Sequence, residues 1–492
     1  MKAKNWLLSW LIIVVSSLGF LGFCVYKIDP FFHYHKPELD KYYYTLDNQR
    51  SQNDGIIKHF DYDALISGTS MTENFRTTEV DKLFGCNSIK VSYSGGSYKE
   101  INDNIKNALK ANKDLRLVIR CLDISNLLQP YDDMRTDLGK YPTYLYDDNP
   151  FNDVEYLLSR DVIFGRIYQM IMDKNKEGFK PGITAFDDYS RWQSKYVFGI
   201  NTIRTDSLTV TEIEQIHLND EEKEIIKKNI ELNVTNVADE YPDVEFYYFY
   251  SPYSVVSWNE WRNGGALYKI LEAEEYTTEL IVPHKNIHLF SFNNRTDITT
   301  DLNNYHGSTH YASWINSLIL KWMKDGQYRL TEDNYKDYLI REYDFCTTFD
   351  YSSLNSQEDY EADYYAAALL NKELTGVDPM DVLSNDKVEV IKDKGTTVIK
   401  FEVDLDDGYN YLCFDGQKLM DSGKLTAYVY DCCGNVVERT EVDYSDLDNE
   451  IHQYAIDLST VKGKVTVILS GGDIDSSVNP YSNYRFSNVY MY

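Results

Sequence analysis

A serine directly follows an apolar stretch near residue 65. The run Leu65-Ile66-Ser67-Gly68-Thr69-Ser70 passes from strand-like residues through a glycine to two hydroxyl residues, where a helix should begin. This strand, turn and helix layout is typical of a nucleophile site. Backbone N–H groups at a helix N-terminus can also hold an oxyanion. The layout indicates Ser70 as a nucleophile. The alternative is that Ser70 caps the helix, because Ser70 and Glu73 have the spacing of a capping box.

A second polar stretch, residues 300–316, supplies an acid and two histidines. It follows the strand-like Ile287–Phe292 and precedes an apolar helix. A serine after the first strand, with an acid and a histidine after the last, is the order expected of a Ser-His-Asp hydrolase built on a parallel sheet. The order predicts His310 as the base and Asp301 as its acidic partner.

Strand-like and helical patterns alternate between these two stretches. Strands are expected at residues 64–67, 88–92, 115–122 and 244–250, with helices at 72–84 and 98–112. This alternation predicts an α/β fold with a parallel sheet flanked by helices. Asp123 follows the third strand at its carboxyl end, where α/β sheets place their ligand sites. Asp123 therefore either orients substrate or caps the next turn.

On these residues the chain resembles the SGNH (GDSL-type) hydrolase and acyltransferase superfamily. It looks most like the membrane-anchored extracellular branch of the teichoic-acid D-alanylation and alginate O-acetylation proteins. Gly68-Thr69-Ser70 matches the Gly-Asp-Ser block, Gly95-Gly96 the second block and His310-Tyr311 the final histidine block. The resemblance implies a flavodoxin-like sheet and an oxyanion held by a backbone N–H near Gly95 or Gly96. The alternative is that the two glycines only form a tight turn.

The chain departs from this family at three places. Thr69 stands where the family has aspartate, the Gly-x-Asn-Asp block is absent, and Gly307 stands where the family has the aspartate three residues before histidine. Asp301 is the nearest acid that precedes His310. His306 is a fallback base, because Asn303-x-x-His306 has the family's acid-x-x-His spacing with asparagine in place of aspartate.

The composition excludes several classes of function. A formal net charge of −29 opposes binding to nucleic acid and close adhesion to anionic lipid. The seven cysteines show no spacing typical of a zinc site or a disulfide framework, and no metal or cofactor is predicted. The 43 tyrosines are attributed to β-rich surfaces, with sugar stacking as the alternative.

The first 28 residues read as a transmembrane signal anchor. Lys2 and Lys4 precede the apolar run Trp6–Tyr26, which has the length needed to span a bilayer. A cleaved signal peptide is the competitor, but the run exceeds the usual core of roughly 7–15 residues and no Ala-x-Ala site follows. The flanking lysines predict a single-pass protein of the cell membrane with its body outside.

The 492 residues are too many for one ordinary core, so further folded units are expected. Residues 29–330 form the expected SGNH-like catalytic domain, in which about 150–215 are an insertion that acts as a lid or partner surface. Residues 331–386 read as an acidic linker that ends in a short helix at 357–374. Residues 387–492 contain short strands separated by turns, which predicts a β-sandwich, a domain type that often binds carbohydrate.

Two functions fit the sequence. The first is a membrane-anchored extracellular serine acyltransferase or esterase that acts on acyl groups, O-acetyl in particular, of cell-surface polysaccharide. For this function the resemblance implies a multispanning membrane-bound acyltransferase as the acyl source. The second is a non-catalytic polysaccharide-binding protein that keeps the hydrolase-like fold, an alternative favoured by Gly307 and the missing third block.

Overall fold

A six-stranded sheet forms the centre of the protein. The computed structural model describes residues 2–137, 140–147, 149–176, 178–192, 198–356, 371–393, 396–419, 423–443, 449, 451–471 and 484–492. The sheet has the order β10-β7-β6-β4-β2-β3, with β2, β3, β4, β6 and β7 parallel and β10 antiparallel to β7. Its strands are β2 (Ala64–Gly68), β3 (Ser88–Ser92), β4 (Leu117–Leu122), β6 (Glu245–Tyr250), β7 (Ile287–Ser291) and β10 (Arg329–Leu330). The predicted α/β class with a parallel sheet is confirmed.

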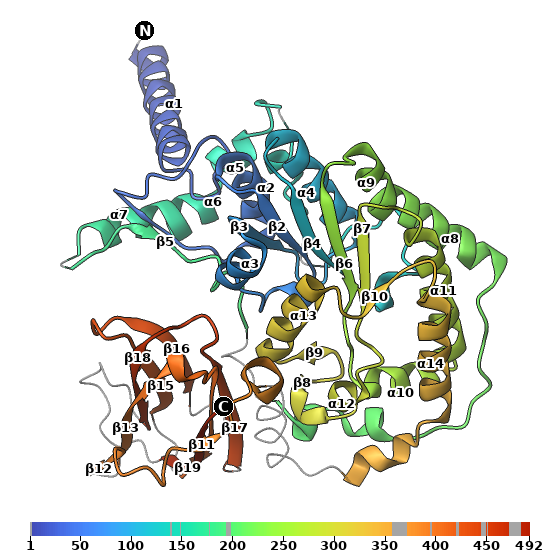
Figure 1. Cartoon of the computed structure of the whole chain (residues 1–492). Coiled ribbons are helices and arrows are strands. Elements are labelled where there is room, and N and C mark those ends of the chain that lie inside the picture. Colours follow the sequence, from blue (N-terminus) through green and yellow to red (C-terminus); the bar gives the residue numbers. More distant parts are fainter. Residues whose placement is uncertain are drawn as a thin grey trace.

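Helices cover both faces of this sheet (Figure 1). One face packs against α2 (Gln49–His59), α4 (Tyr98–Ala111), α8 (Asp220–Ile230), α9 (Asn236–Glu240), α11 (Leu267–Ile281) and α14 (Tyr335–Thr348). The other face packs against α3 (Thr77–Phe84) and α13 (Ser313–Asp325). Strands β2, β3 and β4 are buried at every position, as expected of parallel strands covered by helices on both faces. Two shorter helices, α10 (Val255–Asn263) and α12 (Thr296–Thr299), lie between the elements of this part of the chain.

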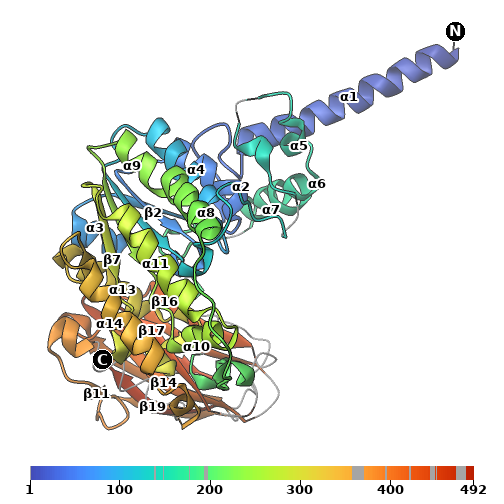
Figure 2. The ribbon, with the colours of Figure 1, turned by 90° about the vertical axis from the view of Figure 1, so that its right-hand side faces the viewer.

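The N-terminal helix α1 (Lys2–Ile28) projects away from the body (Figures 1 and 2). It is long and apolar enough to cross a membrane. At its foot lie α5 (Val154–Leu157), α6 (Arg160–Val162), a π-helical turn (Ile163–Ile167) and α7 (Tyr168–Lys174). Strands β1 (Tyr43–Tyr44) and β5 (Gly182–Ile183) pair beside them.

Two antiparallel sheets form the C-terminal part and enclose one apolar core. The first contains β11 (Met380–Asp381), β14 (Tyr411–Lys418), β17 (Ile451–Asp457) and β19 (Tyr484–Met491). The second contains β12 (Glu389–Asp393), β13 (Thr396–Asp404), β15 (Lys424–Tyr430), β16 (Val436–Asp443) and β18 (Lys464–Ser470). Tyr411 and Tyr492 extend into the core of the central sheet, where Tyr411 contacts Trp314 with ring centroids 5.9 Å apart.

The structure corrects two expectations outside the site. The prediction of a linker directly after residue 331 is wrong, because α14 forms there and buries Tyr335, Tyr338 and Leu339. The expected helix at 357–374 lies largely outside the described residues. The assignment of the tyrosines to surfaces is wrong for many of them, and the largest fully buried side chains include Tyr44, Tyr93, Tyr98, Tyr156, Tyr189, Tyr248, Tyr250 and Tyr305.

Helices α11 and α14 meet at a buried pair of carboxyl groups. The Nδ2 of Asn293 donates hydrogen bonds to Oε1 of Glu274 at 3.2 Å and of Glu342 at 2.8 Å. Burial raises the pKa of both carboxyls, that of Glu342 to about 7 and that of Glu274 well above its ordinary value, with the charge of Glu342 as a further cause for Glu274. Two such groups hold a proton at neutral pH because both cannot ionise in one buried site.

This pair predicts that the protein loses stability as the solution becomes alkaline. A carboxyl whose pKa is raised on folding contributes its full stabilisation below its unfolded pKa and loses it as the pH rises through the folded value, here about 7 for Glu342. We expect Glu342→Gln to raise the thermal unfolding midpoint at about pH 8, by roughly 2–4 °C for each kcal/mol recovered, and to leave it unchanged at about pH 5. The matched control is Glu275→Gln on the exposed side of α11. An equal response of both variants would contradict the prediction.

Candidate functional site

Ser70 lies on a tight turn at the carboxyl end of β2. The strand ends at Gly68, whose φ of +152° and lack of a side chain permit close packing, because a Cβ there would lie 2.5 Å from Sγ of Cys121. A 3₁₀ turn, Ser70–Thr72, follows instead of the expected helix start, and α3 begins only at Thr77. Thr69 caps this turn by accepting a hydrogen bond from the N–H of Met71. The alternative that Ser70 is the cap is therefore wrong.

The histidine stretch folds back onto this turn. A two-stranded ladder of β8 (Tyr305–His306) and β9 (His310–Tyr311) places His306 opposite His310. Oγ of Ser70 and Nε2 of His310 are 2.9 Å apart, although the two residues are 240 positions apart in the chain. Gly307 lies in the connecting turn with a φ of +66°, in the left-handed region that favours glycine. The structure thus brings Ser70 and His310 together at hydrogen-bond distance.

The predicted acidic partner of His310 lies elsewhere. Asp301 precedes a 3₁₀ turn, Leu302–Asn304, and accepts hydrogen bonds from the N–H and the Nδ2 of Asn303. The second ring nitrogen of His310, Nδ1, is instead 3.2 Å from the hydroxyl of Thr309. When Nδ1 carries the proton and donates it to Thr309, Nε2 is left as an acceptor for Ser70. The geometry therefore joins a serine and a histidine without Asp301.

The ring of His310 is held in its neutral form. Burial, and to a smaller extent the nearby His306, together lower its pKa from 6.5 to about 4. A neutral imidazole is the form that can accept a proton from a serine hydroxyl. The edge of the Trp192 ring lies against it, with ring centroids 5.3 Å apart and planes at 88°.

This lowered pKa predicts an unusual acid limb in the pH profile of any esterase activity. Activity requires neutral His310, so it should rise as the pH increases through about 4 and remain level from about pH 6 to 8. An unperturbed histidine would lose half of its base form near pH 6.5. The measurement is kcat/KM for hydrolysis of a small ester across this range. A midpoint near 6.5 would contradict the assigned environment of the ring.

Asp123 lies beneath the serine turn and not in the cavity. Its carboxylate accepts hydrogen bonds from the hydroxyls of Thr69 at 2.5 Å and Tyr253 at 2.7 Å. Lys90, in the middle of β3, donates to the carbonyls of Glu73 at 2.5 Å and Phe75 at 2.8 Å. These buried contacts hold both ends of the turn that carries Ser70, and Asp123 is not among the residues that line the cavity.

The second glycine block, Gly95-Gly96, forms a tight turn after β3. The N–H of Gly96 donates to the carbonyl of Tyr93 at 2.7 Å, so this group is not directed at an oxyanion. Gly95 has a φ of +57°, and a Cβ there would lie 2.3 Å from Nη1 of Arg135. The neighbouring Ser94, not either glycine, lines the cavity at Ser70. The tight turn is confirmed, and an oxyanion contact from Gly95 stays a prediction.

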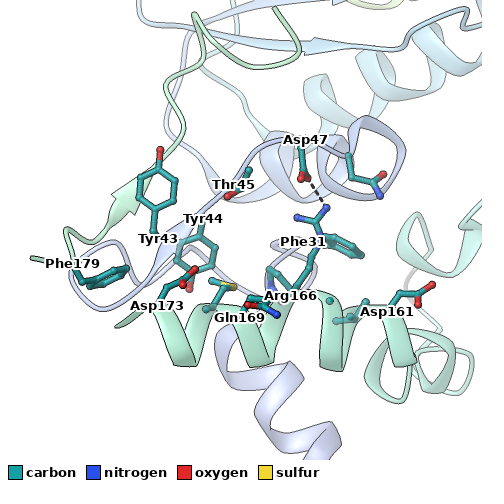
Figure 3. A pocket seen from close by; sticks show the side chains of 15 residues that line it. Phe31, Tyr43, Tyr44, Thr45, Asp47, Asp161, Arg166, Gln169, Asp173 and Phe179 are labelled. Atoms are coloured by element: carbon teal, nitrogen blue, oxygen red, sulfur yellow. Dashed lines mark hydrogen bonds and ion pairs between the residues drawn. The ribbon is translucent and has the colours of Figure 1, made fainter. Parts of the chain in front are cut away.

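A small cavity lies directly in front of the Ser70 hydroxyl. It has a volume of about 220 Å³ and is lined by Ser70, Glu73, Ser94, Trp192, His306 and His310. Glu73, Ser94 and Trp192 also line an adjoining cleft of about 890 Å³. That cleft shares Asp47, Asn48 and Asp161 with a third pocket of about 390 Å³, near the foot of α1 (Figure 3). The three pockets thus neighbour one another between Ser70 and Phe31, which follows the N-terminal helix.

Sequence reasoning missed three of the residues at this site. Trp192 donates from Nε1 to the carbonyl of Ser70 at 3.2 Å and comes from the aperiodic second half of the 150–215 insertion. Thr309 is an ordinary turn residue in the sequence. Only Lys90 carried a usable signal, because a lysine between the apolar Ile89 and Val91 of a buried strand needs buried partners. Among the described residues, no group of three or more His, Cys, Asp or Glu side chains is arranged to hold a metal ion.

The comparisons with known proteins find only distant likenesses. No family model matches the chain, and no curated protein matches it. A structure from Streptococcus pneumonia, provisionally named a platelet activating factor, is 11% identical, with 59% of this chain and 91% of that chain covered and a TM-score of 0.27.

Two further structures are similar in part. A two-domain esterase active on acetylated mannans is 10% identical over 87% of this chain and 89% of its own, with a TM-score of 0.21. A family 6 carbohydrate-binding module from Clostridium cellulolyticum is 15% identical over 23% of this chain and 95% of its own, with a TM-score of 0.16. At these identities and scores the comparisons assign the chain to no family, so the function must be argued from the geometry of the site.

Proposed function

We propose that this protein is a membrane-anchored extracellular serine acyltransferase or esterase that acts on acyl groups, O-acetyl in particular, of cell-surface polysaccharide. The contact between Ser70 Oγ and His310 Nε2 carries the proposal. A nucleophile and a base at hydrogen-bond distance, at the wall of a cavity, form the minimal apparatus for acyl transfer. The neutral state of His310 supports the same role.

The chemistry follows from these two side chains. His310 accepts the hydroxyl proton of Ser70 while Oγ forms a bond to the acyl carbonyl carbon. The bond to the leaving oxygen then breaks, and His310 returns the proton to that oxygen. The backbone N–H of Ser70, at the first position of its 3₁₀ turn, has no acceptor within the turn and supports the oxyanion. Such a donor contributes about 3 kcal/mol to the transition state.

The second half of the reaction decides between the two activities. Water that attacks the acyl-enzyme completes hydrolysis, whereas a sugar hydroxyl completes transfer. The cleft of about 890 Å³ that adjoins the serine cavity provides room for a sugar acceptor. In this proposal α1 anchors the protein beside a multispanning membrane-bound acyltransferase that supplies the acyl group. The C-terminal sheets of residues 387–492 are the proposed carbohydrate-binding domain.

A non-catalytic polysaccharide-binding protein is the second candidate. One observation favours it, because Nδ1 of His310 meets the hydroxyl of Thr309 and not a carboxylate. A carboxylate at that position would orient the ring and stabilise the imidazolium that forms during the reaction.

Labelling with a fluorophosphonate separates the two candidates. We expect the reagent to modify Ser70 in the full-length protein and the adduct to disappear in Ser70→Ala and in His310→Ala. The matched control is Ser94→Ala, since Ser94 lines the same cavity but the base His310 is bonded to Ser70, and this variant should keep the label. The absence of an adduct on Ser70, under conditions in which a control esterase reacts, would support the non-catalytic function.

A further inference from the structure

The end of α1 is built into the body of the protein. Residues before it in the helix are largely exposed, with Phe20 66% and Phe23 60% accessible, whereas Val25 is fully buried and Ile28 is 4% accessible. Both belong to a small apolar cluster with Phe31, Leu145, Tyr156, Val162, Ile163 and Ile167. The last turns of α1 therefore pack against the helical segment at residues 154–174. This packing fixes the position of the segment along the axis of α1, at its C-terminal end.

That segment lies across α1. In Figures 1 and 2, α6 and α7 run past the foot of α1 and not along it. The π-helical turn joins them without a break, because its flanking residues keep right-handed helical dihedral angles. If α1 crosses the bilayer, as in the proposed anchoring, a helix that crosses its end lies close to the plane of the membrane surface.

One side of this helix is polar and the other is apolar. Asp161, Arg166, Gln169 and Asp173 face the pocket formed with residues 43–48, on the side away from α1 (Figure 3). Large apolar side chains are exposed elsewhere on the helix: Phe164 is 60%, Tyr168 51%, Ile171 38% and Met172 47% accessible. Their spacing of i, i+4, i+7 and i+8 places these four on one face.

We infer that the helix of residues 160–174 is an interfacial membrane helix, with the face of Phe164, Tyr168, Ile171 and Met172 embedded in the lipid surface. Apolar area of this kind on a helix that lies in the interfacial plane drives binding at the boundary between headgroups and acyl chains. The helix that this segment crosses, α1, also exposes large apolar side chains, and Tyr168 suits the headgroup level. Because the protein is strongly acidic, zwitterionic lipid is the fitting surface.

Photo-crosslinking in a lipid-only system tests this inference. The photoreactive residue p-benzoylphenylalanine replaces Phe164 or Tyr168 in the full-length protein, which is reconstituted into phosphatidylcholine nanodiscs. The same residue at Ile13 of α1 reports on the span, and at Ile340, 57% accessible on α14, it is the matched surface control. We expect lipid adducts at 164 and 168 within about threefold of the yield at Ile13 and at least about tenfold above Ile340.

Two outcomes would overturn the inference. Adducts at Ile13 together with yields at 164 and 168 no higher than at Ile340 would show that this face does not meet lipid. No adduct at Ile13 would remove the spanning helix on which the inference rests. Fluorophosphonate labelling of Ser70 in the same nanodiscs does not depend on either lipid-crosslinking result. Failure of the proposed serine chemistry can therefore be distinguished from failure of the membrane contact.

Discussion

Replacing His310 with alanine will lower kcat/KM for ester hydrolysis by about 10²- to 10⁴-fold, because a positioned general base contributes about that much. The reason is local, since Nε2 of His310 is 2.9 Å from Oγ of Ser70. The loss should appear mainly in kcat, because the ring accepts the Ser70 proton in the transition state and does not contribute to substrate binding. The assay is the hydrolysis of a small activated ester by the full-length protein.

Asp301 supplies the sharpest control for this result. Its carboxylate is bonded to Asn303 and not to His310, so Asp301→Asn should change kcat/KM by less than about twofold. A loss in Asp301→Asn as large as that in His310→Ala would show that the acid reaches the ring in the working enzyme. If His306→Ala instead abolished activity while His310→Ala did not, the fallback base would be the correct one.

The second large effect concerns stability. Arg76→Met should lower the free energy of unfolding by about 3–5 kcal/mol, because removing one partner leaves the other charges buried without compensation. The guanidinium is only 3% accessible and donates to Thr460 Oγ1 at 2.7 Å, Glu438 Oε2 at 3.1 Å and the carbonyl of Asp457 at 2.6 Å. These contacts join the turn after β2 to the C-terminal sheets.

The measurement is the denaturation midpoint of the full-length variant, followed by circular dichroism and by intrinsic fluorescence. Arg439→Met is the matched control, because Arg439 is an exposed arginine beside Glu438 in the same strand, and it should stay within about 0.5 kcal/mol of wild type. Arg191 also donates to Glu438, at 2.7 Å. This contact with the C-terminal sheets remains in Arg76→Met. Equal midpoints for the two variants would contradict the assigned role of Arg76.

The parts of the fold that the sequence predicts well are those governed by local pattern. The strands that begin at Ala64, Ser88 and Ile287 begin at the residues where the sequence predicts them. Because carboxyl ends of parallel strands meet at one edge, the chain order of Ser70 and His310 was enough to place them together.

The rest depends on contacts that the local pattern does not encode. Whether Asp301 reaches the histidine is decided by a 3₁₀ turn that directs its carboxylate onto Asn303. Trp192 arrives from a stretch with no periodicity. The expected linker became α14 because Tyr335 and Tyr338 bury their rings, and a tyrosine-rich helix reads as polar when hydroxyls and acids are counted together.

The size of the cavity at Ser70 limits what the serine can accept. The space in front of Ser70, about 220 Å³, is smaller than the roughly 300 Å³ at which drug-sized ligand pockets begin. Only the reacting ester and its immediate neighbours fit there, and the remainder of a longer molecule must extend past Trp192 into the cleft. The residues that distinguish short from long substrates would therefore be those of the cleft, and not those that contact the bond that breaks.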